Sequence, residues 1–137
     1  MQRISRGMKA GMKRILPLAF ICLIAATAMA QQVTPLLTEK MPDLPGKEID
    51  VITVEYAPGS VDPIHRHNAH AVVYVLSGEI EMQVRGGKLQ HLGPGQVFYE
   101  SPTDVHTVGR NASKTKPAKF VVFFIKNEGS PILVPAQ

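Results

Sequence analysis

Residues 59–78 of the chain read GSVDPIHRHNAHAVVYVLSG. The part at 71–76 is apolar throughout, is rich in valine, and stops at the turn pair Ser77-Gly78. Valine favours strands, and a short apolar run bounded by turn residues is typical of a strand buried in a sheet. The stretch therefore predicts a central strand of a β domain, which the chain enters through a histidine-rich segment.

The flanking sequence consists of further short strand-like segments separated by turn residues. Residues 79–84 alternate polar and apolar side chains, and Gly86-Gly87 after them is typical of a two-residue hairpin turn. In all, strands are expected at 50–56, 71–76, 79–84, 88–91, 97–100, 105–108, 120–126 and 132–134. The polar stretch 110–119 is expected to be a loop. About seven or eight short strands, with no helical periodicity, predict an all-β sandwich or barrel in one domain over residues 50–137.

Residues 1–30 have the three-part order of a secretory signal peptide. Five positive charges in the first 14 residues precede an apolar run over 15–26 and the small-x-small pattern Ala28-Met29-Ala30. The run spans about a dozen residues, whereas a membrane-spanning helix needs roughly 20. We therefore expect cleavage after Ala30, secretion, most simply to a bacterial periplasm, and no stable membrane anchor. The sequence leaves the start codon open between three methionines: Met1, Met8 and Met12.

The charge of the chain changes with this cleavage. Residues 1–30 hold five of the 15 Lys and Arg and none of the 11 Asp and Glu, so the remainder has a net charge of −1. No basic surface then remains to indicate a nucleic-acid partner. The single cysteine, Cys22, is removed as well, which excludes disulfides and thiol chemistry. Residues 31–49 are polar and proline-spaced and are expected to form an extended N-terminal arm.

The histidines provide the main chemical signal. His65 and His67 stand two positions apart at the entry to a strand, and residues i and i+2 of a strand point to the same face. Both imidazoles would therefore aim together, as two ligands of one metal ion must. His106, at the start of a separate predicted strand, is the candidate third ligand. The His-x-His spacing alone leaves open that the pair is merely exposed and polar.

Two spaced motifs resemble those of the cupin superfamily. Gly59, followed after five residues by His65-x-His67 and after ten more by Gly78, resembles its first motif. Gly95, followed after ten residues by His106, resembles its second motif. The resemblance covers about residues 50–127. It implies a small jelly-roll barrel in which His65, His67 and His106 hold one divalent metal ion.

The chain departs from the cupin pattern at one important position. The pattern usually has a metal-binding glutamate where this chain has Ala71. A glutamate introduced there is expected to add a ligand. His70 is a candidate substitute, but strand parity points it away from the face shared by His65, His67 and Ala71. Three other polar residues near these motifs, His91, Glu100 and Asp104, are expected to be exposed, although one of the acids could orient a histidine.

The ligand set bears on function without deciding it. Imidazole suits several divalent transition metals, so Fe, Ni, Mn, Zn and Cu all remain possible. Three neutral ligands leave the ion its full charge, which favours anionic ligands and, with the resemblance, a dioxygenase-like enzyme acting on a small acidic or enolic substrate. No catalytic residue is identified. The alternatives are a non-catalytic module for a small molecule or metal, and a sugar isomerase or epimerase, for which Arg66 and Arg85 are weak candidates. Because 71–76 is apolar on both faces, a homodimer is expected.

Overall fold

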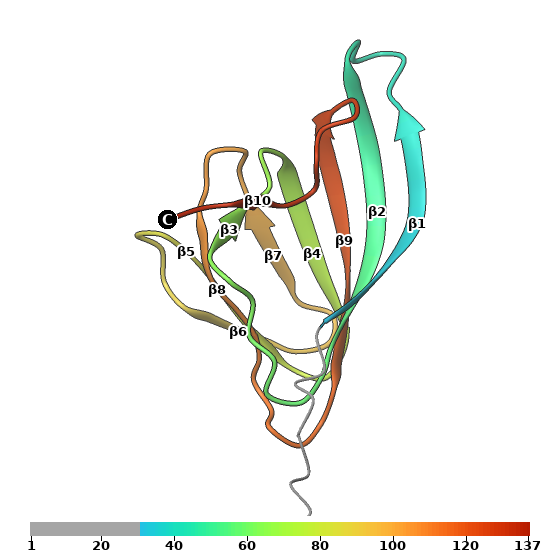
Figure 1. Ribbon diagram of the computed structural model, residues 1–137. Coiled ribbons are helices and arrows are strands. Elements are labelled where there is room, and N and C mark those ends of the chain that lie inside the picture. Colours follow the sequence, from blue (N-terminus) through green and yellow to red (C-terminus); the bar gives the residue numbers. More distant parts are fainter. Residues whose placement is uncertain (1–30) are drawn as a thin grey trace, which may run out of the picture.

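The computed structural model describes residues 31–137, which form ten β-strands in two sheets (Figure 1). The first sheet has the order β1-β2-β9-β4-β7 and the second the order β10-β3-β8-β5-β6. The strands are β1 (Gln32–Lys40), β2 (Lys47–Tyr56), β3 (His65–Arg66), β4 (His70–Ser77), β5 (Ile80–Val84), β6 (Gln90–Leu92), β7 (Val97–Glu100), β8 (His106–Asn111), β9 (Ala118–Asn127) and β10 (Val134–Pro135). Among these residues no helix is long and apolar enough to span a membrane. The expected signal peptide, 1–30, lies outside the described residues.

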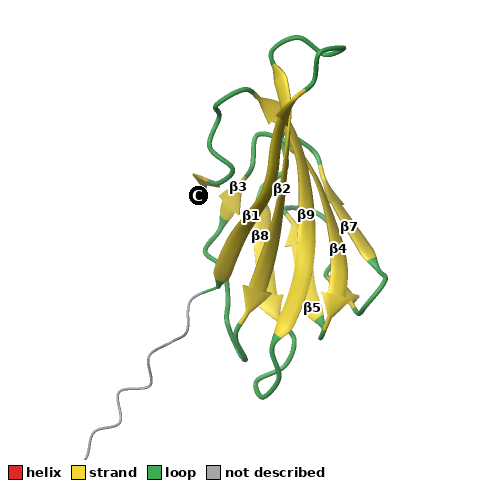
Figure 2. Cartoon of the chain, turned by 90° about the vertical axis from the view of Figure 1, so that its right-hand side faces the viewer, coloured by secondary structure: helices red, strands yellow, loops and turns green. Residues whose placement is uncertain are grey.

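All neighbouring strands pair antiparallel, and the chain passes repeatedly from one sheet to the other. Of the connections after β2, only the β5–β6 hairpin stays within one sheet. Figure 2 looks onto the first sheet, with strands of the second sheet behind it. This alternation between two packed sheets is a jelly roll, so the predicted all-β class holds, with ten strands in place of seven or eight.

The core lies between the two sheets. Alternate residues of β9, at 118, 120, 122, 124 and 126, are buried, whereas the residues between them are exposed or half-buried. The second sheet contributes Ile80, Met82 and Leu92 to the same hydrophobic cluster. This period-two burial is what a sheet with one face on the core requires. The inward faces of the two sheets therefore enclose the space in which the site is built.

Two expectations about loops need correction. The segment expected to be an extended arm contains β1, which pairs with β2 at the edge of the first sheet, with a register shift at Pro35. The segment expected to be a loop at 110–119 is shorter, because β8 continues to Asn111 and β9 begins at Ala118. Both segments form strands because their backbones pair with a neighbouring strand. Arg110, for example, pairs with Glu81 although it is polar.

Candidate metal centre

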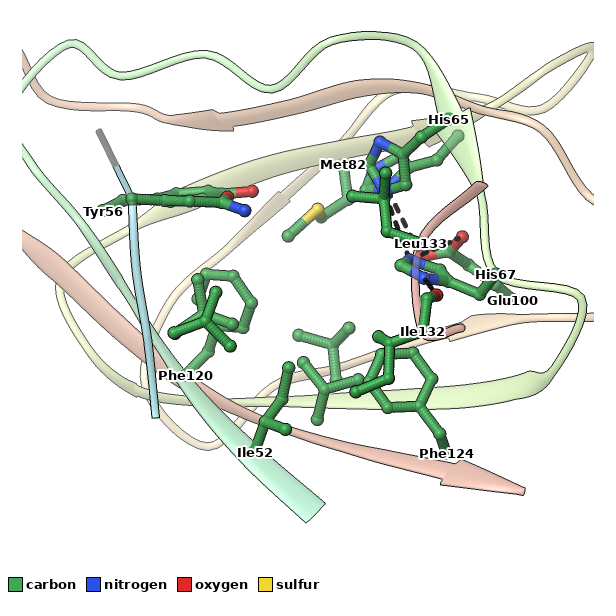
Figure 3. Close-up of a pocket in the computed structure, with 16 residues that line it drawn as sticks. Ile52, Tyr56, His65, His67, Met82, Glu100, Phe120, Phe124, Ile132 and Leu133 are labelled. Atoms are coloured by element: carbon green, nitrogen blue, oxygen red, sulfur yellow. Dashed lines mark hydrogen bonds and ion pairs between the residues drawn. The ribbon is translucent and has the colours of Figure 1, made fainter. Parts of the chain in front are cut away.

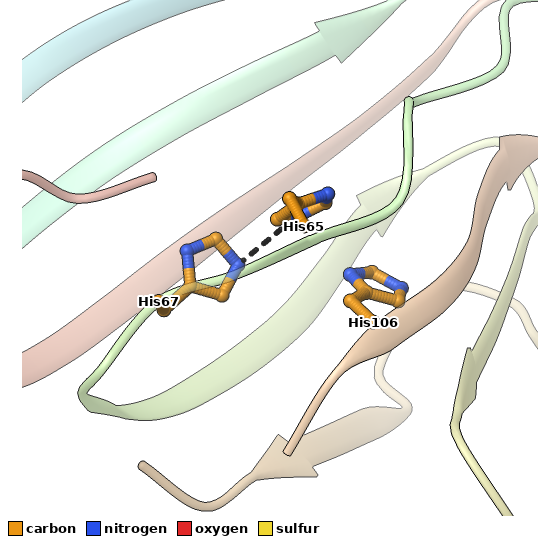
Figure 4. A group of neighbouring side chains, drawn as sticks. All are labelled: His65, His67 and His106. Atoms are coloured by element: carbon orange, nitrogen blue, oxygen red, sulfur yellow. Dashed lines mark hydrogen bonds between the residues drawn. The ribbon is translucent and has the colours of Figure 1, made fainter. Parts of the chain in front are cut away.

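The structure brings the three predicted histidines together (Figure 4). One ligand atom from each of His65, His67 and His106 lies within 4.8 Å of the others. His65 in β3 and His106 in β8 are direct cross-strand partners, which explains how residues so far apart in the chain meet. His67 lies just beyond β3, and the chain then reverses through Asn68, whose φ of 50° is left-handed. Asparagine tolerates this conformation better than most residues.

Main-chain carbonyls determine which nitrogen of two rings carries the proton. Nδ1 of His65 lies 2.7 Å from the carbonyl oxygen of Pro63, and Nδ1 of His67 lies 2.6 Å from that of Ile132. A carbonyl can only accept, so both Nδ1 atoms must donate, and in the neutral rings both Nε2 atoms keep a free lone pair. These Nε2 atoms are 3.2 Å apart. Two lone pairs facing each other at this distance are stabilised by a cation placed between them.

His106 has an unsatisfied nitrogen that a metal would satisfy. Among the described residues, neither ring nitrogen has a hydrogen-bond partner, although both are buried. Unpaired polar atoms in a protein interior cost roughly 1–3 kcal/mol each. Burial, reinforced by the neighbouring His65, lowers the pKa of His106 to about 4. Burial likewise lowers the pKa of His67 to about 4. Both rings are therefore neutral at pH 7, the state in which imidazole ligates metal.

A fourth polar residue, Glu100, lies against this cluster. It ends β7, is only 2% exposed, and has Oε1 3.4 Å from Nδ1 of His106. Its Oε2 is 4.0 Å from Nε2 of His67. Burial, with smaller contributions from Asp104 and Asp62, raises the pKa of Glu100 to about 7. The expectation that Glu100 is a solvated loop charge is therefore wrong.

The strand pattern explains this correction. Along β7 the burial alternates, so that Glu100 shares the inward face with Phe98. The sequence indicates this burial, because Glu100 follows the apolar Phe98 by two positions within a predicted strand, and such residues share a face. Asp104 has a different role, since its Oδ2 accepts a hydrogen bond of 2.7 Å from the Ser101 backbone and closes the turn before β8.

The other histidines lie outside the cluster. His70 is exposed, and its Nδ1 lies 2.7 Å from the Tyr99 hydroxyl. It therefore does not replace the missing glutamate, as strand parity indicated. His91 is exposed beside Glu79 and Glu81, with ring nitrogens 3.2 Å and 3.5 Å from their carboxylates.

The histidines and Glu100 open into a cavity of about 210 Å³ between the sheets (Figure 3). Its walls are mainly apolar and include Ile52, Val54, Val73, Phe120, Val122 and Phe124. Figure 3 shows Tyr56 across the cavity from His67 and Glu100. No lysine or arginine is among the described residues that line it. The histidines, Glu100 and Tyr56 are therefore the ionisable groups that a ligand would meet there.

The end of the cavity near Tyr56 depends on a glycine. The Tyr56 hydroxyl donates a hydrogen bond to the Asp62 carboxylate. Burial and then the nearby Asp62 charge raise the pKa of Tyr56, which keeps the phenol protonated. A Cβ at Gly109 would lie 2.8 Å from Asp62 Oδ2, 3.0 Å from His106 Cε1 and 3.2 Å from the Tyr56 hydroxyl. Gly109 thus leaves the room in which His106 and the Tyr56–Asp62 pair approach one another.

The chain is similar in sequence to two plant proteins. The chain is 27% identical to germin-like protein subfamily 2 member 3 of Arabidopsis thaliana over 124 residues, covering 87% of this chain and 56% of the relative. Over 57 residues it is 40% identical to subfamily 2 member 2 of the same plant, covering 41% of this chain and 26% of that protein. The chain thus spans about half or less of these relatives.

Solved structures show the same fold. DMSP lyase DddQ from Ruegeria pomeroyi superposes with a TM-score of 0.65 at 22% identity, covering 84% of this chain and 56% of the lyase chain. An oxalate oxidase in complex with the substrate analogue glycolate superposes with a TM-score of 0.58 at 27% identity, covering 80% and 56% of the two chains. The family described as Cupin domain matches residues 52–124. The chain therefore belongs to the cupin family.

Proposed function

We propose that this protein is a secreted cupin that binds one divalent transition metal through His65, His67 and His106 and acts on a small organic acid. The supporting observation is the converging pair of Nε2 lone pairs, whose direction two main-chain carbonyls fix. Such carbonyl contacts are the usual means by which proteins orient metal-ligating histidines. One unpartnered nitrogen of His106 would complete a set of three donors that fits a metal ion.

A bound ion of this kind supplies a Lewis-acid centre and, if it is Fe, Mn or Cu, a redox centre. The protein's own residues determine which ligand can reach it. No lysine or arginine of residues 31–137 lines the cavity, so this part of the chain offers no cation to a substrate carboxylate. An acidic substrate would therefore direct its carboxylate to the metal end and its carbon skeleton to the apolar walls.

The size and the relatives support the same substrate class. A cavity of about 210 Å³ is smaller than the roughly 300–1,000 Å³ typical of sites for drug-sized ligands. The oxalate oxidase whose structure resembles this chain was solved with glycolate, a substrate analogue. We therefore propose a small carboxylic acid as the substrate and dioxygenase-like oxidation as the reaction.

The structure disfavours one alternative and leaves another. A sugar isomerase or epimerase was linked to Arg66 and Arg85, but both are exposed and neither lines the cavity. Arg85 instead donates a hydrogen bond to the backbone carbonyl of Gln137. A non-catalytic binding module remains the second candidate, since the same site could hold an acid without turning it over.

One screen separates these functions. Metal-free protein is reloaded separately with Fe, Mn, Cu, Ni or Zn and offered a panel of small mono- and dicarboxylic acids. Oxygen consumption measures turnover, and calorimetry measures binding with the same panel. Turnover that is lost in the His106→Ala variant supports the enzyme. Saturable binding without turnover supports the module, and no binding of any acid by metal-loaded protein contradicts both.

We also propose secretion, supported by the order of charge, apolar run and small residues in 1–30. Amino-terminal sequencing of the protein from its native host should begin at Gln31. A mature protein that retains Met1, Met8 or Met12 contradicts the proposal.

A homodimer is proposed from the outward face of β4. Val72, Tyr74 and Leu76 are 38–45% exposed there, and Val97 and Tyr99 of the neighbouring β7 are about half exposed. Exposed apolar patches of this kind often mark protein interfaces. Sedimentation should show a dimer at micromolar concentration that Tyr74→Lys dissociates, and a monomeric parent would contradict it.

A further inference from the structure

We infer that Glu100 is a fourth ligand of the metal, and that its carboxylate, supplied from β7, takes the place of the glutamate that the cupin pattern has at Ala71 on β4. This inference rests on the proposed metal site. It concerns the composition of the site, and its test is separate from the test of whether metal binds at all.

The distances fit one coordination sphere. With bonds of about 2.0–2.2 Å, two adjacent ligand atoms of a six-coordinate ion lie about 3 Å apart, and two opposite ones about 4.2 Å apart. The separation between Nε2 of His65 and of His67 is 3.2 Å. The Glu100 oxygens lie 3.4 Å from a His106 nitrogen and 4.0 Å from Nε2 of His67. These three separations lie between the adjacent and the opposite spacing, and because the histidine ligand atoms lie within 4.8 Å of one another, a bound ion would draw the rings closer together.

Glu100 also lacks a cation of its own. It is 2% exposed, and among residues 31–137 no lysine or arginine forms an ion pair with it, since its contacts with ionisable groups are with the rings of His67 and His106. An ionised carboxylate that is buried without a partner is strongly unfavourable. A divalent cation at the centre of the cluster would neutralise it and use its lone pairs.

Ala71 and Glu100 are complementary across the two strands. They are direct partners in the β4–β7 register, and Ala71 is completely buried. Directly opposed residues on one sheet face have Cβ atoms about 4.5–5.5 Å apart, so their side chains compete for the same space. The methyl group of Ala71 leaves this space to the Glu100 carboxylate. A glutamate introduced at Ala71 alone would therefore meet a second carboxylate in the same space.

A fourth protein ligand narrows the class of acids that can bind the metal. Three imidazoles and one carboxylate leave two open positions on a six-coordinate ion and reduce its charge from +2 to +1. Two open positions suit an acid that offers oxygen atoms from two separate groups and so closes an unstrained chelate ring, such as a small dicarboxylate or a 2-hydroxy acid. A simple monocarboxylate should therefore bind more weakly than these to the metal-loaded protein.

The test moves the carboxylate from one strand to the other. Two measurements are made on each protein: calorimetry gives the zinc affinity, and the absorption spectrum of the cobalt-loaded protein reports the ligand set. The four proteins are the parent, Glu100→Gln, the double variant Ala71→Glu with Glu100→Ala, and the control Glu79→Ala. Glu79 is an exposed carboxylate of the same chain, so its loss removes an equal charge far from the cavity.

Glu100→Gln should weaken zinc binding by more than about 100-fold, beyond the 10–100-fold expected if Glu100 only orients a ligand. The double variant should recover at least tenfold of this loss and a cobalt spectrum like that of the parent, whereas Glu79→Ala should change neither. Parent-like zinc affinity and cobalt spectrum in Glu100→Gln would overturn the inference while leaving the metal site intact. A parent that binds no zinc or cobalt would instead overturn the proposed function.

Discussion

Two buried clusters on the inward face of the first sheet differ in whether a cationic side chain balances the charge of their carboxylates. In one cluster, Lys126 is 3% exposed, forms an ion pair with Glu48, and has its Nζ 3.1 Å from Asp50 Oδ2. The backbone N–H of Gly129 also donates to Glu48. In the other cluster, Glu100 has a similar burial, and among the residues that the structure describes its ionisable contacts are two histidines, with no lysine or arginine.

The pKa values express the same difference. The hydrogen bond from Lys126 lowers the pKa of Glu48, so this carboxylate stays ionised. Burial opposes the charge of Lys126, but its hydrogen bonds to Glu48 and Asp50 outweigh this and raise its pKa. Burial instead raises the pKa of Glu100 to about 7. The first cluster is thus neutralised by the chain itself, whereas under the proposed function the second would be neutralised by a cation from outside.

Removing a metal ligand should have the largest effect. The change His106→Ala should reduce zinc affinity by more than about 100-fold, because a direct ligand is lost, and losses of outer residues already cost 10–100-fold. Calorimetric titration measures the affinity, and far-ultraviolet circular dichroism checks that the β fold persists. The matched control is His91→Ala, an exposed histidine outside the cavity, which should bind zinc like the parent. Equal losses in both variants would contradict the assignment.

Removing charge should affect stability in opposite ways in the two clusters. Lys126→Met should lower the free energy of unfolding by about 2–3 kcal/mol, because it leaves the buried Glu48 and Asp50 without their cation. Glu100→Gln should not lower the stability of the metal-free protein, because it removes a buried charge that has no cation. Urea unfolding without metal compares the two. A loss in Glu100→Gln as large as that in Lys126→Met would show that the chain neutralises both clusters equally.

Adding a methyl group beside the metal site should have the smallest effect on zinc affinity. Gly109→Ala places a methyl group 3.0 Å from His106 Cε1 and 2.8 Å from Asp62 Oδ2, so these side chains must shift by a few tenths of an ångström. A displaced ligand should weaken zinc binding by about 10-fold. Gly93→Ala is the control, because the nearest atom to its added Cβ is at an ordinary 3.8 Å. Unchanged zinc affinity in Gly109→Ala would mean that His106 has free room to move.

The sequence identified His65 and His67 because their arrangement is local. The two-residue spacing of His65 and His67 predicts a shared direction, and the cupin resemblance supplied His106. The alternation along 97–100 indicated that Glu100 is buried, but its place opposite Ala71 depends on the register of β4 and β7, which the sequence does not state. The same limit applies to β1, whose pairing with β2 is non-local, and to Gly109, which matters only through the groups packed around it.

The central claim is that an external cation completes the second cluster, and a metal titration followed by unfolding tests it most directly. Metal-free protein should bind one equivalent of zinc per chain. At free zinc 100-fold above the dissociation constant, the free energy of unfolding should rise by about 2.7 kcal/mol. A variant that lacks His65, His67 and His106 together should show neither effect. No bound zinc in the parent, or the same binding and stabilisation in the triple variant, would contradict the account.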